Sequence, residues 1–357
     1  MPIPTFTPEQ VARAKAYTPT AMWVPPDPQA VTDQLAGVYA RTADRLIKII
    51  HSADVTDWRR AFSKQQLEQV RNELAKLGPQ VAAWTSQNVP TLYENGLAVA
   101  DQYLMAPDHV PLYRAAREDG LDHFAAVARV NEQTGNAGPG GLSVAAHPGQ
   151  VTPMDLRFTR LHAEAVRTLS ENIVLPLGDA NAYCAQRIES MVARAKRLSQ
   201  ERFGGDTGKA WERQLQYREV SLDTLQDAFA RGDTQRQAER SFLAGLKQRG
   251  ITGFTDRAGR DWDIRTYANM VVQTVAQETL RHGTENRLIE ANIDLVKVDG
   301  HHAGECDICA HWANKGLSLT GATPGFPTVD QSHAAGMWHP HDRHAMFPYI
   351  PEYEEAA

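Results

Sequence analysis

The residues best suited to bind a metal ion lie near the end of the chain. Cys306 and Cys309 form a Cys-x-x-Cys pair, and this spacing can present two sulfurs to one ion from a tight turn. His339, Asp342 and His344 follow in the segment HPHDRH and offer imidazole and carboxylate ligands. A tetrahedral zinc ion is commonly bound by two such short groups of ligands separated by a longer loop. The sequence therefore predicts a structural zinc site among these residues.

Three ligands of this site follow directly from the pattern, and the fourth is open. Thiolate and neutral imidazole both suit zinc, so the two cysteines and His339 are the first three candidates. The fourth is either Asp342 or His344, with His302 as a further candidate. The alternative is a pair of reduced, partly buried thiols beside a group of surface histidines.

Length and composition describe a globular protein. The chain has 357 residues, of which 22% are charged and 42% are apolar, so it can bury a sizeable core. The net charge of −6 argues against a protein devoted wholly to nucleic acid. Three cysteines favour a reducing compartment over a disulfide framework. Because neither a signal peptide nor a long apolar run is evident, we expect neither secretion nor membrane insertion.

Proline, glycine and apolar periodicity divide the chain into segments. Prolines crowd the start and favour an extended arm, whereas apolar residues at helical spacing predict helices through most of the following sequence. The predicted segments are an extended proline-rich arm over residues 1–28, a helical region over 29–133, a Gly/Pro-rich linker over 134–152, a long-helix region over 153–250 and an α+β domain over 251–357. The predicted fold class is a mainly α N-terminal region followed by a small α+β C-terminal domain with a Cys/His metal-binding-like module.

Single prolines and glycines predict where helices stop. Pro90 is expected to break one helical segment, and Pro176 is expected to interrupt or kink another. A helix that begins at Ile264 is expected to end at Gly283.

Short strands are predicted in the C-terminal domain. Residues 251–255 and 260–263 flank a turn and form a plausible hairpin. Residues 293–298 form a further strand, which precedes the Cys-x-x-Cys pair.

A helix predicted over residues 179–202 has a basic side. One interpretation is a solvated face with ion pairs to neighbouring glutamates. The other is contact with DNA phosphate or with an acidic partner. The basic residues are Arg187, Arg194, Lys196, Arg197 and Arg202.

A string of C-terminal motifs resembles the tailed-phage minor capsid protein 2 family, which is similar to the Mu-F-like head morphogenesis proteins. The resemblance is specific over about residues 250–350. In that family the last motif usually reads H-P-x-C-R-H, and Asp342 stands here at the position of its cysteine. Because of this departure, a Cys3His zinc site is in doubt. The ligand set is then Cys2HisAsp or Cys2His2, or the chain binds no metal. The motifs are RTYANMVV from Arg265, IDLVKV from Ile293, CDIC from Cys306, GMWHP from Gly336 and Arg343-His344.

The resemblance implies a structural and not an enzymatic role. Family members are minor head components that associate with the portal vertex inside the head. Portal protein and major capsid or scaffold proteins are the implied partners, and contact with packaged DNA is a further expectation. The implied location is the virion, inside the capsid near the portal, and the bacterial host cytoplasm during assembly.

Two enzymatic roles are alternatives to this structural role. A metal-dependent nuclease-like hydrolase could use His339, His341 and His344 beside Asp342 to supply a base and a metal-bound water. A transferase domain attached to a head-assembly module is less favoured, because the chain has no Gly-rich phosphate loop.

Overall fold

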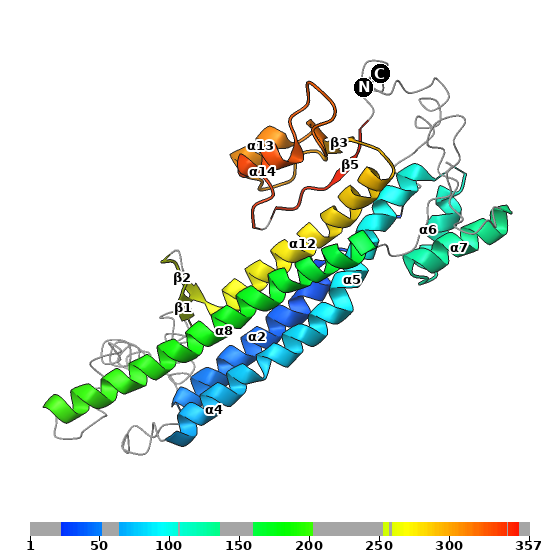
Figure 1. Cartoon of the computed structure of the whole chain (residues 1–357). Helices are drawn as coiled ribbons and strands as arrows, with labels where there is room; N and C mark the ends of the chain where they lie inside the picture. Colours follow the sequence, from blue (N-terminus) through cyan, green and yellow to red (C-terminus); the bar gives the residue numbers. More distant parts are fainter. Residues whose placement is uncertain are drawn as a thin grey trace, which may run out of the picture. The chain divides into compact units, whose positions relative to one another are not determined.

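The structure is a computed structural model, and the described residues are 23–51, 64–105, 108–135, 160–202, 253–256, 259–340 and 342–349. The N-terminal part of these residues is helical, and the C-terminal part combines helices with a small antiparallel sheet (Figure 1). This confirms the predicted fold class. The predicted segment boundaries stay a prediction, because most of the arm, the linker and the stretch before residue 253 lie outside the described residues.

The chain forms two compact units, each built from segments that are distant in sequence. The first unit contains Met1–Gln29, Ser86–Glu171 and Gln273–Ala357. The second unit contains Ala30–Thr85 and Asn172–Val272.

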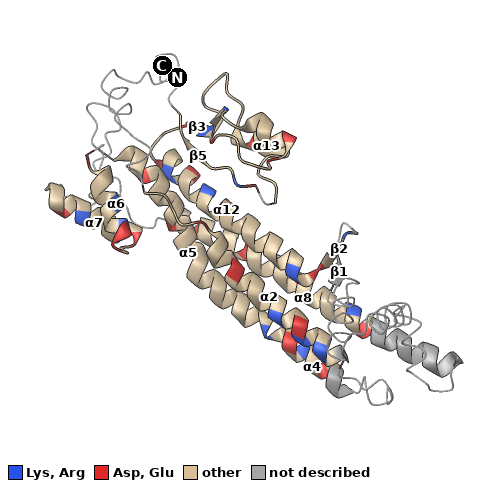
Figure 2. Cartoon of the chain, turned by 180° about the vertical axis from the view of Figure 1, so that it is seen from behind, with Lys and Arg blue, Asp and Glu red and all other residues tan. Residues whose placement is uncertain are grey.

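Helices α2 (Gln29–His51) and α4 (Lys64–Ala75) belong to the second unit, together with parts of α5 (Leu77–Leu104) and α8 (Arg160–Arg202). Their buried apolar side chains recur at helical spacing and form the core of this unit. Acidic and basic residues lie close together on α2 and α4 (Figure 2). Glu73 of α4 pairs with Arg45 of α2 and with Lys76, which follows α4. The buried residues are Leu35, Tyr39, Leu46, Val70, Leu74, Leu177 and Ile188.

The predicted hairpin is confirmed, and it lies in the second unit. Strands β1 (Gly253–Thr255) and β2 (Asp261–Asp263) pair antiparallel, with Phe254 opposite Trp262. In the turn, Asp256 accepts hydrogen bonds from the backbone N–H and from Nε of Arg260, at 2.9 and 2.8 Å.

The predicted break at Pro90 does not occur, and Pro176 does not interrupt its helix. Helix α5 continues through Pro90, and α8 continues through Pro176 from Arg160 to Arg202. In α8, Ile173 and Leu177 on either side of the proline are fully buried. The packing of an apolar face on both sides of a proline can offset the hydrogen bond that the proline removes.

Helix α12 (Ile264–Glu290) also continues past the point where it was predicted to end. A Cβ atom added at Gly283 would overlap the carbonyl oxygen of Tyr93, and one added at Gly96 would overlap that of Leu280. The backbones of α5 and α12 therefore touch within the first unit, where Thr284 Oγ1 donates a hydrogen bond to the Gly96 carbonyl at 3.0 Å. Gly283 is required for this close approach and does not end the helix.

Buried charged groups surround this contact in the first unit. Arg287 and Asp101 are fully buried and form an ion pair at 3.0 Å. Arg287 also pairs with Glu290 at 2.9 Å, and His123 Nε2 lies 2.9 Å from the other oxygen of Asp101. Charges that are removed from water need such partners, because an unpaired one would cost several kcal/mol, roughly 3–5. The network therefore links α5, α12 and α7 (His123–Thr134).

Helices α6 and α7 have recognisable ends. In α6 (Val110–Glu118), Pro111 stands in the first turn, where a missing N–H costs nothing. In α7, the Asp122 side chain accepts the N–H of Ala125, and Gly135 closes the helix with a positive φ of 73°.

The C-terminal module, residues 293–349, contains a three-stranded antiparallel sheet in the order β4-β3-β5. Its core includes Leu288 of α12 and Ala100 of α5. The sheet therefore packs on the helices of the first unit. The elements are β3 (Leu295–Val298), α13 (Asp307–Trp312), β4 (Gly316–Ser318), α14 (Val329–Ala334) and β5 (Met346–Pro348). Strand β3 confirms the strand predicted over residues 293–298. Among the described helices, none combines the length and apolar character that a membrane span requires.

We expect Gly283→Ala to lower the free energy of unfolding by about 1–3 kcal/mol, because the added methyl group forces α5 and α12 apart. The matched control is Gly178→Ala in α8, where an added Cβ meets nothing within 4 Å. That change should raise stability by up to about 1 kcal/mol, since alanine favours the helix over glycine. Urea unfolding of both variants measures the difference, and equal effects would contradict the close contact.

We expect the protein to lose stability as the pH falls below about 6.5, in part through His162. Burial lowers the pKa of His162 below 6.5, so the unfolded chain binds the proton more readily than the folded one. This contribution is complete above about pH 6.5 and is lost progressively at lower pH. Urea unfolding across this range should show a weaker acid dependence in His162→Gln than in the wild type. The exposed His333→Gln should behave like the wild type, and an unchanged profile in His162→Gln would refute the assignment.

Candidate metal centre

Cys306 and Cys309 are positioned by the start of α13. Cys306 is the N-cap residue of this helix, with extended backbone angles, and Cys309 lies in its first turn. The loop before it follows strand β3, so the sheet fixes where the helix begins. Cys306 is exposed, whereas Cys309 is only 2% exposed.

His339 is positioned by the residue before it. Trp338 is buried and has a positive φ of 62°. Its indole Nε1 donates to Ser332 Oγ at 2.9 Å, and the Arg281 guanidinium lies 4.5 Å from its ring centre. Because Trp338 is held on both sides, the direction of the following His339 is fixed.

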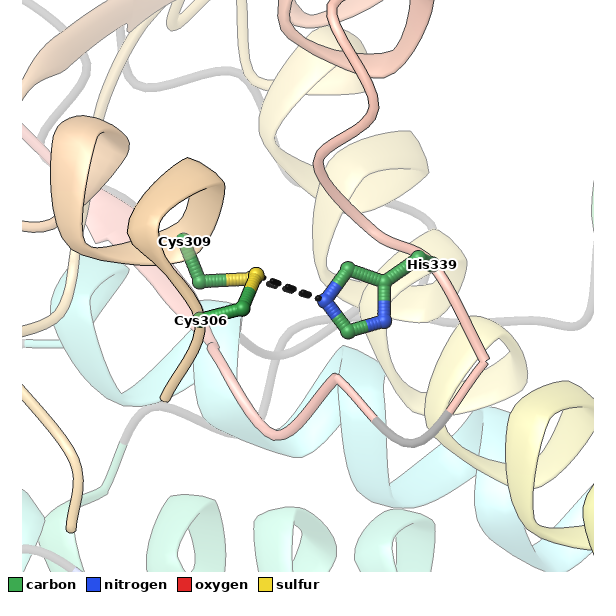
Figure 3. Close-up of side chains that lie close together, drawn as sticks. All are labelled: Cys306, Cys309 and His339. Carbon is green, nitrogen blue, oxygen red and sulfur yellow. Dashed lines mark hydrogen bonds between the residues drawn. The ribbon is translucent and has the colours of Figure 1, made fainter. Parts of the chain in front are cut away.

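The three side chains converge on a common point. His339 Nε2 lies 3.3 Å from Cys306 Sγ and 3.2 Å from Cys309 Sγ, with both sulfurs turned toward the imidazole (Figure 3). A tetrahedral zinc ion with ordinary Zn–S and Zn–N bonds would separate these atoms by about 3.6 Å. A shift of a few tenths of an ångström would therefore make room for the ion.

The tautomer of His339 also suits an ion. Its Nδ1 donates to the carbonyl oxygen of Pro340 at 2.8 Å. The lone pair of Nε2 is then directed at the two sulfurs. A hydrogen bond of this kind on the outer nitrogen is typical of metal-bound histidines.

The two thiols differ in acidity. The backbone N–H of Cys309 is the main cause that lowers the pKa of Cys306 to about 7. Burial and the nearby Asp342 carboxylate raise the pKa of Cys309 to about 12. A bound cation would supply the positive charge that makes the second thiolate stable in this buried position.

Asp342 organises the turn that carries His339. One carboxylate oxygen accepts the N–H of Trp338 at 2.9 Å, and the other accepts the N–H and Nδ1–H of His344 at 3.0 and 2.8 Å. The hydrogen bonds from His344 contribute to keeping the pKa of Asp342 below its usual value, against the effect of burial. Ligand atoms of Cys309, Asp342 and His344 lie within 4.8 Å of one another.

The structure therefore brings all five predicted ligands into one region. The two cysteines and His339 form one group of ligand atoms. Asp342 and His344 form a second group with Cys309, which belongs to both. The donor set of two sulfurs and one imidazole fits zinc, whereas the fourth ligand stays a prediction. His302 is grouped with Asp299 and His344 and not with the cysteines, and His341 lies outside the described residues.

Asp299 and Glu305, which were not predicted from the sequence, lie beside His302 and His344. Both are in the loop DGHHAGE after strand β3. Acidic residues on either side of a histidine pair were a signal, but the sequence did not show that this loop lies next to residues 342–344.

The region that contains the candidate ligands is similar to a known protein family. Residues 209–357 match the family model of phage minor capsid protein 2. This match confirms the resemblance over the C-terminal part of the chain. No curated protein and no solved structure matches the chain. All predicted metal ligands lie within the minor capsid region, residues 209–357.

We expect Cys306→Ser and His339→Ala each to lower the affinity for a thiolate-bound metal ion by more than about 100-fold. Both remove an atom from the converging group. The control is His311→Ala, because His311 is an exposed histidine of the same helix that interacts with Lys315. After loading with Co2+, thiolate-to-cobalt charge-transfer absorption should be present in the wild type and the control and absent in the two variants. Persistence of this absorption in Cys306→Ser would argue against the site.

Proposed function

We propose that the protein is a structural component of a phage virion and lies inside the head near the portal vertex. The observation that carries this proposal is the match of residues 209–357 to the phage minor capsid protein 2 family. Portal protein and major capsid or scaffold proteins are the proposed partners.

The chemistry of the metal site supports a structural role. Two thiolates, an imidazole and one further ligand would complete the four positions of a structural zinc ion. The sheet of the C-terminal module has strands of only three or four residues, so its own core is small. An ion that joins α13 to the turn at His339 would stabilise this module. We therefore propose zinc as a structural cofactor and a non-enzymatic role, in preference to the hydrolase alternative.

The length of α8 supports a role in contacts with neighbouring subunits. Its 43 residues extend over about 65 Å. The basic residues predicted to face DNA lie in its second half, although side chains from residue 191 onward lie outside the described ones. Contact between this part of α8 and packaged DNA is part of the proposal.

Assembly in the presence and absence of the protein tests the proposed role. The full chain should co-purify with the portal protein of its phage, and deletion of its gene should reduce the yield of infectious particles. Cys306→Ser should be incorporated less well than the wild type, and His311→Ala should be incorporated normally. If the chain does not bind portal or procapsid, and its deletion leaves infectivity unchanged, the proposal is wrong.

A separate measurement tests contact with DNA. Affinity for duplex DNA should fall steeply with salt and should decrease when Arg194 and Arg197 are changed to glutamate. Affinity that does not depend on salt or on these arginines would remove DNA contact from the proposal without affecting the portal assignment.

A further inference from the structure

The loop between β3 and α13 holds a second group of metal-ligand side chains. Asp299 follows β3 directly, and its backbone is fixed on both sides. Its N–H donates to the Ala345 carbonyl at 3.0 Å, and its own carbonyl accepts the N–H of Asn314 at 3.1 Å. These bonds place the Asp299 side chain beside the segment that carries His344.

Four side chains meet in this region. His302 Nε2 lies 3.0 Å from Asp299 Oδ2, and His344 Nε2 lies 3.2 Å from Glu305 Oε2. The rings of His302 and His344 are 4.6 Å apart at their centres. Ligand atoms of Asp299, His302 and His344 all lie within 4.8 Å of one another. Nitrogen and oxygen ligands of a tetrahedral zinc ion are about 3.3–3.5 Å apart, so this group is close to the required spacing.

Two buried polar atoms in this group lack hydrogen-bond partners among the described residues. His344 is only 5% exposed, and its Nε2 makes no hydrogen bond, although Glu305 lies close to it. Asp299 Oδ1 is also buried without a hydrogen bond. Leaving such atoms unsatisfied costs free energy, and an ion that is bound by both would satisfy them.

The tautomer of His344 directs its free nitrogen into this group. Its Nδ1 lies 2.8 Å from Asp342 Oδ1, a carboxylate oxygen that can only accept, so Nδ1 carries a proton. In the neutral ring the lone pair is then on Nε2. A carboxylate that accepts the outer N–H of a histidine orients the ring of a metal ligand. The two nitrogens of His344 therefore serve different groups: Nδ1 binds Asp342, and Nε2 is available to a cation.

We propose that Asp299, His302 and His344 form a second cation site, separate from the site at the cysteines, with Glu305 as an additional carboxylate ligand. This assignment makes His344 a ligand of the second site. Asp342, which is close to Cys309, is then the fourth ligand at the cysteines. The Asp342 carboxylate would then be a ligand at the cysteines and would also accept the Nδ1–H of His344, a ligand of the second site.

The ligand types indicate the class of ion. Two imidazoles with carboxylates suit zinc and other first-row divalent metals. Calcium and magnesium prefer ligands that are all oxygen. The inference does not rest on the virion role, because it depends only on the geometry of these side chains.

Metal content of the purified full chain tests the second site. After removal of bound metal and dialysis against Zn2+, the wild type should hold about two ions per chain. His302→Ala and Asp299→Asn should each lower this to about one, and Cys306→Ser should also leave about one. The matched control is His333→Ala, because His333 is an exposed histidine of the same module outside both groups, and this variant should keep about two ions.

Loading with Co2+ shows which ion is lost. Thiolate-to-cobalt charge-transfer absorption should persist in His302→Ala and Asp299→Asn and disappear in Cys306→Ser. Because the absorption requires a folded cysteine site, it also shows that the first two variants have folded. The second site is refuted if the His302 and Asp299 variants bind as much metal as the wild type. It is also refuted if Cys306→Ser holds no metal, or if His302→Ala loses the thiolate absorption, since either result means a single shared site.

Discussion

The contact between the backbones of α5 and α12 is the constraint on which the first unit depends. Gly96 and Gly283 allow the two helices to touch, because neither has a Cβ atom to keep them apart. This approach accompanies the ion pair of Asp101 with Arg287 at 3.0 Å. On the same two helices, Ala100 and Leu288 belong to the core of the C-terminal module. The position of the metal ligands thus follows from a helix contact that involves none of them.

The buried network beside this contact matches charged groups on several helices. Arg287 is fully buried and interacts with Asp101 and Glu290, while His123 and His162 contact the same carboxylates. Apolar residues of similar volume can often replace a buried ion pair without loss of stability, but they do not require a particular partner. Charged groups that find partners in only one register favour a single arrangement of α5, α7, α8 and α12.

The sequence predicted those features of the structure that depend on local residue patterns. The hairpin of β1 and β2, strand β3 and the convergence of Cys306, Cys309 and His339 were predictable from periodicity and ligand spacing. The role of Gly283 was not, because a glycine that ends a helix and one that permits a helix contact look alike in one sequence. Asp299 was missed for a related reason, since the pairing of β3 with β5 is what brings its loop beside His344.

Asp342 stands where the family usually has a cysteine, and this difference leaves the charge of the ligand set unchanged. Thiolate and carboxylate are both anionic ligands, so a zinc ion at Cys306, Cys309, His339 and Asp342 would still have three anionic ligands and one neutral ligand. A carboxylate also has a second oxygen and several lone pairs. Asp342 uses these to accept the N–H of Trp338 and the Nδ1–H of His344, bonds that a thiolate would form only weakly. The aspartate can therefore fix the turn at His339 and orient His344 at the same time, and this connection makes two neighbouring cation sites chemically consistent.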